Sequence, residues 1–210
     1  MFKKWMTIAL TLAICLLCAA CGTSPSEDPG TKQETANTQR TYTFMKRCFD
    51  GGNYKMTFKA FSEGGTDTEE VTVAAKNDMY YMHSKTADAN QTVLFKDGKQ
   101  YVLFNDNKVY MVTDSEGSAD EGRIDFKSED FAQKEVKTGT EEIAGKNYTY
   151  EEFEDGGIIS RYCYEENGDT PKYIINMKED QKFYMEISDV TTDVPDSVFE
   201  IPEDFSPLEY

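Results

Sequence analysis

From Tyr54 onward, apolar and polar side chains alternate along the chain with a period of two. Tyr54, Met56 and Phe58 alternate with lysine and threonine, and Val71 and Val73 flank a threonine. Successive side chains of a β-strand point to opposite faces of a sheet, so this alternation is typical of strands that are buried on one face. The period of two recurs over most of the chain and predicts a fold built on a β-sheet.

Tight turns separate the alternating runs. The segment TVLFKDGKQYVLF, residues 92–104, places Asp97-Gly98 between two β-rich runs, and this dipeptide is a strong signal for a two-residue hairpin turn. NDNK at 105–108 predicts another turn, and a second set of aromatic runs follows between 148 and 187. Together these runs predict about nine or ten antiparallel strands joined by short connections.

One helix is expected before the sheet. Apolar side chains between residues 41 and 49 recur at the spacing of one helical face, and Gly51-Gly52 ends the pattern. Ser128 followed by two acidic residues predicts the cap of a short helix that contains Phe131. Because a meander this long rarely stays flat, we expect a mainly β fold with one or two helices. The antiparallel meander should curl into an incomplete barrel packed on the N-terminal helix.

The first 20 residues have the pattern of an export signal. Lys3 and Lys4 precede a mostly apolar run from Trp5 to Ala20, and two alanines close the run. The run is shorter than the roughly 20 residues that a membrane-spanning helix needs. A basic start, an apolar middle and a small-residue end predict a secretory signal peptide over residues 1–20.

The end of this segment carries a family resemblance. Leu17-Cys18-Ala19-Ala20-Cys21 resembles the lipobox of bacterial lipoproteins, in which the cysteine after two small residues is acylated with a diacylglyceryl group and becomes the mature N-terminus. The resemblance implies lipidation of Cys21 and an extracytoplasmic protein that acyl chains, such as palmitate, hold on a bacterial membrane. An ordinary cleaved signal peptide and an uncleaved anchor helix are the alternatives.

The composition after the signal divides the chain in two. Residues 22–40 contain no large apolar side chain and are dominated by Pro, Gly, Ser and Thr, so we expect a flexible tether over 21–40. Residues 41–210 are then expected to form a single half-barrel β domain. Without residues 1–20 the chain keeps 20 basic and 39 acidic residues, a net charge of −19. Such a surface excludes nucleic acid as a partner, and membrane attachment has to come from the lipid.

The chain offers little for catalysis or metal binding. His83 is the only histidine, which excludes a hydrolytic triad with histidine and a two-histidine metal site within one chain. We expect His83 at the end of a strand on the surface. There is no phosphate-binding glycine loop, and the Asp-rich turns lack the spacing of an EF-hand. We therefore expect no cofactor, no metal and no enzymatic activity.

Two further cysteines lie within the expected domain. Cys48 and Cys163 remain once Cys21 is acylated, and an exported protein meets an oxidising compartment. A disulfide between them would join the first helix to the second meander. Two buried free thiols are the alternative.

A second resemblance concerns the whole domain. The lipobox, the glycine-rich exit from the first helix, the aromatic meander and the closing VFEIPEDF at 198–205 are together similar to the LolA/LolB-like lipoprotein carriers. The resemblance implies an incomplete β-barrel whose concave face is covered by helices. It also implies that something hydrophobic binds between the sheet and the helix.

Three neighbouring segments, 79–82, 101–104 and 109–112, are apolar on both faces. A half-solvated strand should alternate, so an unbroken apolar run indicates cover on both sides. The helix and core would cover one face, and the other needs a ligand, a partner or more of the same chain. The candidate hydrophobic surface comprises Met79, Tyr81, Tyr101, Leu103 and Tyr110.

These observations lead to one expectation and one alternative. The chain is expected to be a non-enzymatic, membrane-anchored lipoprotein that binds a hydrophobic ligand or a lipidated partner in its half-barrel. The alternative is a structural or protein-interaction module of the cell envelope, with a filled core and no ligand.

Overall fold

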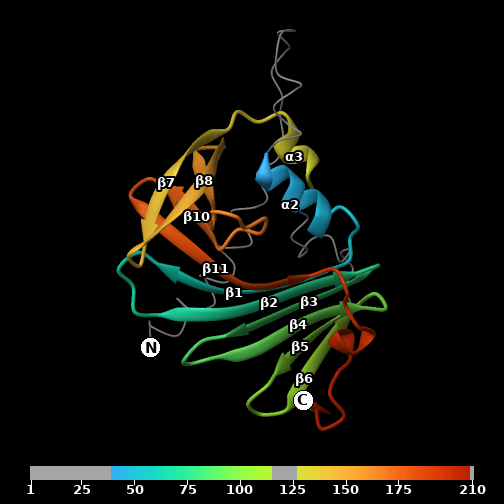
Figure 1. The fold of residues 1–210 in the computed structure, drawn as a ribbon. Coiled ribbons are helices and arrows are strands. Elements are labelled where there is room, and N and C mark those ends of the chain that lie inside the picture. Colours follow the sequence, from blue (N-terminus) through green and yellow to red (C-terminus); the bar gives the residue numbers. More distant parts are fainter. Residues whose placement is uncertain (1–38, 115–126, 209–210) are drawn as a thin grey trace.

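The computed structural model describes residues 39–114 and 127–208. The expected signal peptide, the lipidated Cys21 and nearly all of the expected tether lie outside the described residues. The described chain forms mainly β structure, with short helices packed against one curved sheet (Figure 1).

All the described strands belong to one open, curled sheet of twelve strands, as the expected incomplete barrel requires. Their order across the sheet is β12-β6-β5-β4-β3-β2-β1-β11-β10-β9-β8-β7. The strands are β1 (Tyr54–Ser62), β2 (Thr68–Lys76), β3 (Met79–Lys85), β4 (Asn90–Lys96), β5 (Lys99–Phe104), β6 (Val109–Asp114), β7 (Lys137–Ile143), β8 (Lys146–Asp155), β9 (Ile158–Tyr164), β10 (Tyr173–Lys178), β11 (Gln181–Thr191) and β12 (Ser206–Pro207).

Two runs of consecutive hairpins make up the sheet. The runs β1–β6 and β7–β11 are each antiparallel throughout, and β1 pairs with β11 to join them. The joint contains a bulge at Thr57 and Phe58, which face Asp189 and Ile187 and leave Ser188 as the extra residue. A bulge increases the local twist and bend of a strand, which helps the sheet to curl at this point.

The expected turn at Asp97-Gly98 is confirmed. Both residues have positive φ, 54° and 69°, as the tight turn between β4 and β5 requires. Asn77, Lys108 and Glu179 also adopt positive φ at turns between neighbouring strands, although none is glycine. The prediction of nine or ten strands was too low, because the polar strand β7 and the short β12 were not recognised.

Within the described residues, two helices and one short 3₁₀ turn accompany the sheet: α2 (Arg40–Cys48), α3 (Glu129–Ala132) and η3 (Asp196–Phe199). Helix α2 confirms the helix expected over 41–49, and α3 contains the buried Phe131 as expected. Ser128 occupies the N-cap position of α3 as expected, but its side chain makes no cap hydrogen bond. Instead, the Ser128 amide and hydroxyl donate to the Asp50 carboxylate, at 3.0 and 2.7 Å.

The main core lies between α2 and the sheet face that we call the inner face. It contains Phe44, Met45 and Cys48 of the helix and Phe49 directly after it, together with apolar side chains of β1, β2 and β11. The opposite sheet face, called the outer face, is partly covered by the segment after β11, which runs through η3 to β12 beside β6 (Figure 1).

Candidate functional site: apolar surfaces on the two faces of β3–β6

The five residues of the candidate hydrophobic surface share the outer face. Register places Tyr81 beside Leu94, Leu94 beside Tyr101, and Leu103 beside Tyr110, so their side chains lie on one side of β3–β6. Met79 precedes Tyr81 by two residues and takes the same side. The structure therefore brings the candidate residues together, as the sequence predicted.

More of the same chain covers part of this outer surface. Phe199 and Val194, from the C-terminal segment, are buried with Leu94 and Ala74 in one cluster. Met79, Tyr81 and Tyr101 pack against that cluster, as do Val198 and Ile201. Burial raises the pKa of the Tyr81 hydroxyl above its usual value. A ligand, a partner or more of the same chain was expected to cover this face, and the C-terminal segment of the chain covers part of it.

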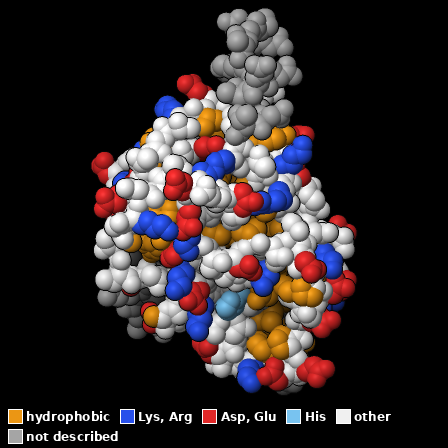
Figure 2. Space-filling model, viewed as in Figure 1, with side chains coloured by type: hydrophobic (Ala, Val, Ile, Leu, Met, Phe, Trp, Pro, Cys, Tyr) orange, Lys and Arg blue, Asp and Glu red, His pale blue; other side chains and the backbone are white. Residues whose placement is uncertain are grey.

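The outer face keeps some exposed apolar area. Val112, on β6, is 46% exposed. Figure 2 shows apolar side chains gathered low on the visible face, among a mosaic of acidic and basic residues. The outer positions of β3–β6 also carry charges, namely Lys85, Lys96, Lys99 and Asp114. The outer surface is thus mixed in character and partly filled.

The space directly under helix α2 is packed. Phe44, Met45 and Cys48 on the helix are buried against Tyr54, Met56 and Phe58 on β1. The Phe49 ring contacts both Phe44 and Tyr54 edge-on, with centroids 5.5 and 4.7 Å apart. A ligand between the helix and β1 would have to displace this core.

The inner face changes character beyond the helix, on β3–β6. Its side chains there are all uncharged, and seven of them form what we call the inner apolar surface: Met82, Val93, Phe95, Val102, Phe104, Val109 and Met111. Each of the seven is partly exposed. Met82 and Phe95 pack on the edge of the main core, whereas Val93, Val102 and Phe104 lie beyond its buried residues. The candidate residues predicted from the sequence are the alternate positions on the outer face, so this inner surface was not predicted, although the same unbroken apolar runs contain most of its residues.

One acidic side chain lies beside the inner apolar surface. Glu69, on β2, points to the inner face opposite Ala60 and is 4% exposed. The Ser84 hydroxyl on β3 donates a hydrogen bond to its Oε1. Ser84 in turn pairs across β3 and β4 with Gln91, and Gln91 pairs with Phe104 of the inner apolar surface. A short polar row therefore leads from Glu69 to that surface.

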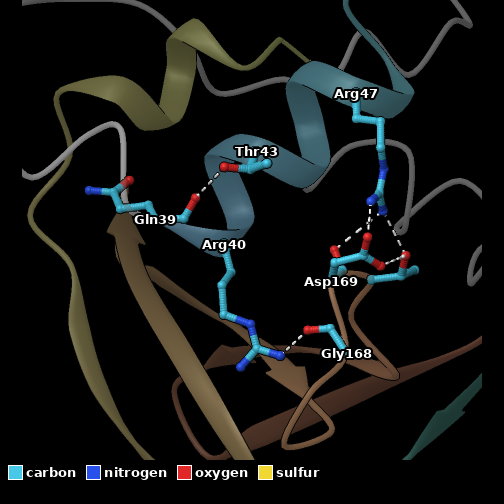
Figure 3. A network of polar contacts seen from close by, with 7 residues as sticks. Gln39, Arg40, Thr43, Arg47, Gly168 and Asp169 are labelled. Carbon is cyan, nitrogen blue, oxygen red and sulfur yellow. Dashed lines mark hydrogen bonds and ion pairs between the residues drawn. The ribbon is translucent and has the colours of Figure 1, made fainter.

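Charged contacts fix α2 at the other end of the inner face. The backbone amides of Arg40 and Thr41 both donate to the Glu151 carboxylate on β8, each at 2.8 Å. Farther along, Arg47 pairs with Asp169 and holds the pKa of that carboxyl below its usual value (Figure 3). The Arg40 guanidinium also donates to the Gly168 carbonyl in the same loop (Figure 3). The helix is thereby held at both of its ends.

The two cysteines lie on opposite faces of the sheet. Cys48 belongs to the main core under α2, whereas Cys163 is buried in a cluster on the outer face with Tyr148, Tyr173 and Ile175. Both are free thiols. The expected disulfide is thus corrected to the alternative of two buried cysteines, because a sheet separates them. Burial raises the pKa of Cys163 to about 12.

His83 lies in the middle of β3 and not at a strand end. Its Nε2 is 2.9 Å from the Asn90 side-chain oxygen, within a network of amide and hydroxyl groups that includes Thr92 and Asn105. Over residues 39–114 and 127–208, no cluster of histidine, cysteine and acidic side chains has a geometry that suits a metal ion. None of the helices in these ranges is long and apolar enough to cross a membrane.

Comparisons with known proteins give only distant likenesses. No family model matches the chain, and no curated protein matches it. Among solved structures, an uncharacterised conserved protein from Thermus thermophilus is 8% identical, with a TM-score of 0.46, over 81% of this chain and 99% of the other. LprF from Mycobacterium bovis is 10% identical, with a TM-score of 0.46, over 84% of this chain and 100% of the other.

A third solved structure is MucB in complex with MucA(peri). It is 12% identical to this chain, with a TM-score of 0.40, over 84% of this chain. The match spans 60% of the MucB chain, so this chain corresponds to less than two thirds of that protein. At TM-scores below 0.5, none of the three likenesses assigns a family or a function to this chain.

Proposed function

We propose that this chain is a non-enzymatic bacterial lipoprotein, anchored outside the cytoplasm through Cys21, which binds a hydrophobic ligand with its half-barrel. The single observation that carries the ligand-binding role is the inner apolar surface. It combines partly exposed apolar side chains with the absence of charge on the inner positions of β3–β6, in a chain with a net charge of −17.

An acyl or alkyl chain is the occupant that suits this surface best. It needs no hydrogen-bond partner, and the surface offers mostly methyl, methylene and aromatic groups. Each methylene removed from water contributes about 0.8 kcal/mol, so a chain of ordinary length has ample free energy to offset its immobilisation. Methionine and aromatic side chains adapt to such ligands easily.

The packed core under α2 moves the expected ligand position away from the space between the helix and β1. Because the core under α2 is filled, the ligand would lie beyond the helix, along β3–β6, and not between the helix and β1. The filled core and the C-terminal cover of the outer face also favour the second candidate, an interaction module of the cell envelope without a ligand. The two candidates differ in whether the inner apolar surface takes up a small hydrophobic molecule.

A fluorescence titration separates the two candidates. The neutral probe N-phenyl-1-naphthylamine should brighten on the wild-type protein lacking residues 1–20. Val102→Lys, which puts a charge at the centre of the inner apolar surface, should weaken probe binding at least tenfold. Val112→Lys is the matched control, since Val112 is an exposed valine of the outer face, and it should bind like wild type. Equal losses in both variants, or no binding by wild type, would favour the interaction module.

The anchor needs a separate test. In a bacterial host that lipidates exported proteins, the full chain should sediment with membranes and carry a diacylglyceryl group at Cys21. A Cys21→Ala variant should lose the modification and leave the membrane fraction. Membrane association of this variant at the wild-type level would contradict the lipid anchor.

A further inference from the structure

The loop of residues 165–170, between β9 and β10, holds helix α2 in place. The Arg40 guanidinium donates to the carbonyl oxygen of Glu165 at 2.8 Å, and it also donates to the carbonyl oxygen of Gly168 (Figure 3). Arg47, farther along the helix, forms its ion pair with the same loop. Any change in the backbone of this loop therefore acts on the attachment of α2.

The loop contains an asparagine of unusual reactivity. The sequence contains nine asparagines, and glycine follows only Asn167. The Asn167 side chain is exposed to water. The backbone nitrogen of the next residue can attack the side-chain carbonyl carbon of an asparagine, and a glycine in that next position has no Cβ to hinder the attack. Asn167 is therefore the asparagine of this chain that is most open to deamidation.

The backbone does not require glycine at position 168. Its φ lies outside the left-handed region that glycine favours, whereas Gly98 in the β4–β5 turn has φ 69°. A Cβ on Gly168 would lie 3.6 Å from both the Cβ and the carbonyl oxygen of Glu165, which is ordinary van der Waals contact. What glycine supplies here is unhindered access of its nitrogen to the Asn167 side chain.

A β-turn controls this access. The Gly168 amide donates to the Glu165 carbonyl oxygen at 3.0 Å, which places Asn167 third in the turn. Asn167 does not have positive φ, as in a type I turn, where ψ of the third residue is near zero. Attack on the side chain requires rotation about this bond, so the turn has to open first. Because Arg40 binds the carbonyl oxygens at both ends of the turn, it holds the turn closed.

We propose that Asn167 is a deamidation site whose product loosens the attachment of α2. The Gly168 nitrogen loses its proton to solvent base and bonds to Asn167 Cγ, and the bond from Cγ to the side-chain nitrogen breaks with release of ammonia. Water then opens the resulting succinimide ring at either of its carbonyl carbons, which gives aspartate or isoaspartate. Isoaspartate places one additional methylene in the main chain, and this moves the Gly168 carbonyl away from Arg40.

The first experiment measures the reaction itself. Protein lacking residues 1–20 is incubated at about pH 8.5, since base promotes the attack, and each asparagine is followed by peptide mass spectrometry. Asn167 should convert at least tenfold faster than Asn107, which is also exposed but precedes a lysine. Gly168→Ala should slow the conversion at least tenfold. If Asn167 of the wild type converts no faster than Asn107, the site is wrong, whatever the variant does.

A pair of helix variants tests the control by Arg40. Arg40→Ala should speed the conversion of Asn167 at least threefold, because the two ends of the turn lose their common donor. Lys46→Ala is the matched control, since Lys46 is an exposed cation of the same helix that lies over the Tyr42 ring, and it should react like wild type. Equal rates in the two variants would overturn the link between the turn and the helix.

Hydrogen exchange tests the consequence for α2. Wild type enriched in isoaspartate at position 167 should exchange its α2 amides at least threefold faster than fresh protein, with β3–β5 unchanged. Asn167→Asp carries the new charge without the additional methylene and should exchange like fresh wild type. Asn167→Gln, incubated in parallel, controls for other effects of storage. Equal α2 exchange in fresh and isoaspartate-rich protein would overturn the loosening of the helix and leave the deamidation site standing.

Discussion

A single glycine on β7 makes room for an aromatic side chain on β8. The Tyr150 ring lies over Gly139, its cross-strand partner, and the Arg161 guanidinium lies 4.5 Å from the ring centroid. Arg161 is itself fixed by Glu141 and Glu152, at 2.5 and 2.7 Å. The aromatic ring is therefore confined between the backbone of one strand and an ion-paired side chain of another.

Gly139→Ala should destabilise the protein. A Cβ at this position would lie 2.6 Å from the Tyr150 hydroxyl oxygen and 2.7 Å from Cζ, so the ring has to move against Arg161. Overpacking of this kind costs about 1–3 kcal/mol of the free energy of unfolding, to be measured by urea denaturation. Gly51→Ala is the control, since no heavy atom lies within 4 Å of its added Cβ. A loss no greater than that of the control would contradict the confined ring.

Cys163 should make stability sensitive to alkali. Burial raises its thiol pKa from 9.0 to about 12, so the unfolded chain ionises first as the pH rises. The contribution of Cys163 is fully present below about pH 9 and is lost between about pH 9 and 12. The difference in the free energy of unfolding between wild type and Cys163→Ala, measured by urea denaturation at several pH values, should therefore shrink as the pH rises above about 9. A constant difference between the two proteins would refute this assignment.

Among the elements, helix α2 depends on a carboxylate from another part of the chain. Glu151 accepts hydrogen bonds from the backbone amides of Arg40 and Thr41 at the start of the helix. Gln39, at the N-cap position, makes no side-chain cap hydrogen bond. A negative charge at this end also interacts favourably with the helix dipole. The strand β8 thus supplies the cap that the local sequence lacks.

Replacing Glu151 by alanine should lower the free energy of unfolding by about 2 kcal/mol, because two amides lose a charged acceptor. Hydrogen exchange of the α2 amides, followed by NMR, should accelerate more than exchange in β3–β5. Glu154→Ala, at a 61% exposed side chain of the same strand, is the control and should change little. Equal effects of the two substitutions would argue against the cap.

The sequence predicted those elements whose signals are local. Asp97-Gly98 specifies its turn through backbone preference alone, and the helix before Gly51 follows from the spacing of apolar residues. Strand β7, with the sequence KTGTEEI, carries no apolar alternation, since its stability comes from pairing with β8. Tertiary pairing of this kind leaves no mark on a single polar segment.

Prediction of the candidate site from the sequence is limited in the same way. The unbroken apolar runs in β3, β5 and β6 predicted cover on two faces, and the five candidate residues do share one face. Which face the C-terminal segment covers depends on where Phe199 packs, far along the chain from Tyr81. Burial of Glu69 was equally hidden, because a sequence with 39 acidic residues gives no reason to single out one of them.

At the scale of the whole molecule, the C-terminal segment closes part of the outer face of the sheet. Phe199 is 1% exposed, and it shares its cluster with Leu94 of β4 and Ala74 of β2. The Lys76 ammonium adds to this attachment by donating to the Val194 carbonyl at 2.8 Å and pairing with Asp196 at 2.7 Å. One aromatic side chain thus holds the last part of the chain against strands from its first half.

Phe199→Ala should cost about 3–5 kcal/mol, as expected for loss of a fully buried phenylalanine. It should also raise the fluorescence of the dye ANS in the native state, because Tyr81, Tyr101 and Leu94 become accessible. Val112→Ala, at an exposed apolar side chain of β6, should change neither quantity by much. Unchanged dye binding in Phe199→Ala would show that the outer face stays closed without this anchor.

The pairing of β1 with β11 has a kinetic consequence. The hydrogen bond from the Ser188 hydroxyl to the Thr57 carbonyl spans 131 positions of the chain, and the whole β1–β11 ladder is similarly remote. During synthesis the strands β1–β6 can pair with one another early. The edge of β1 that pairs with β11 cannot form this ladder until Thr191 has been synthesised. Loop closure over such separations is slow, so we expect the β1–β11 pairing to form last. Its formation should limit the rate at which the runs β1–β6 and β7–β11 join into one sheet.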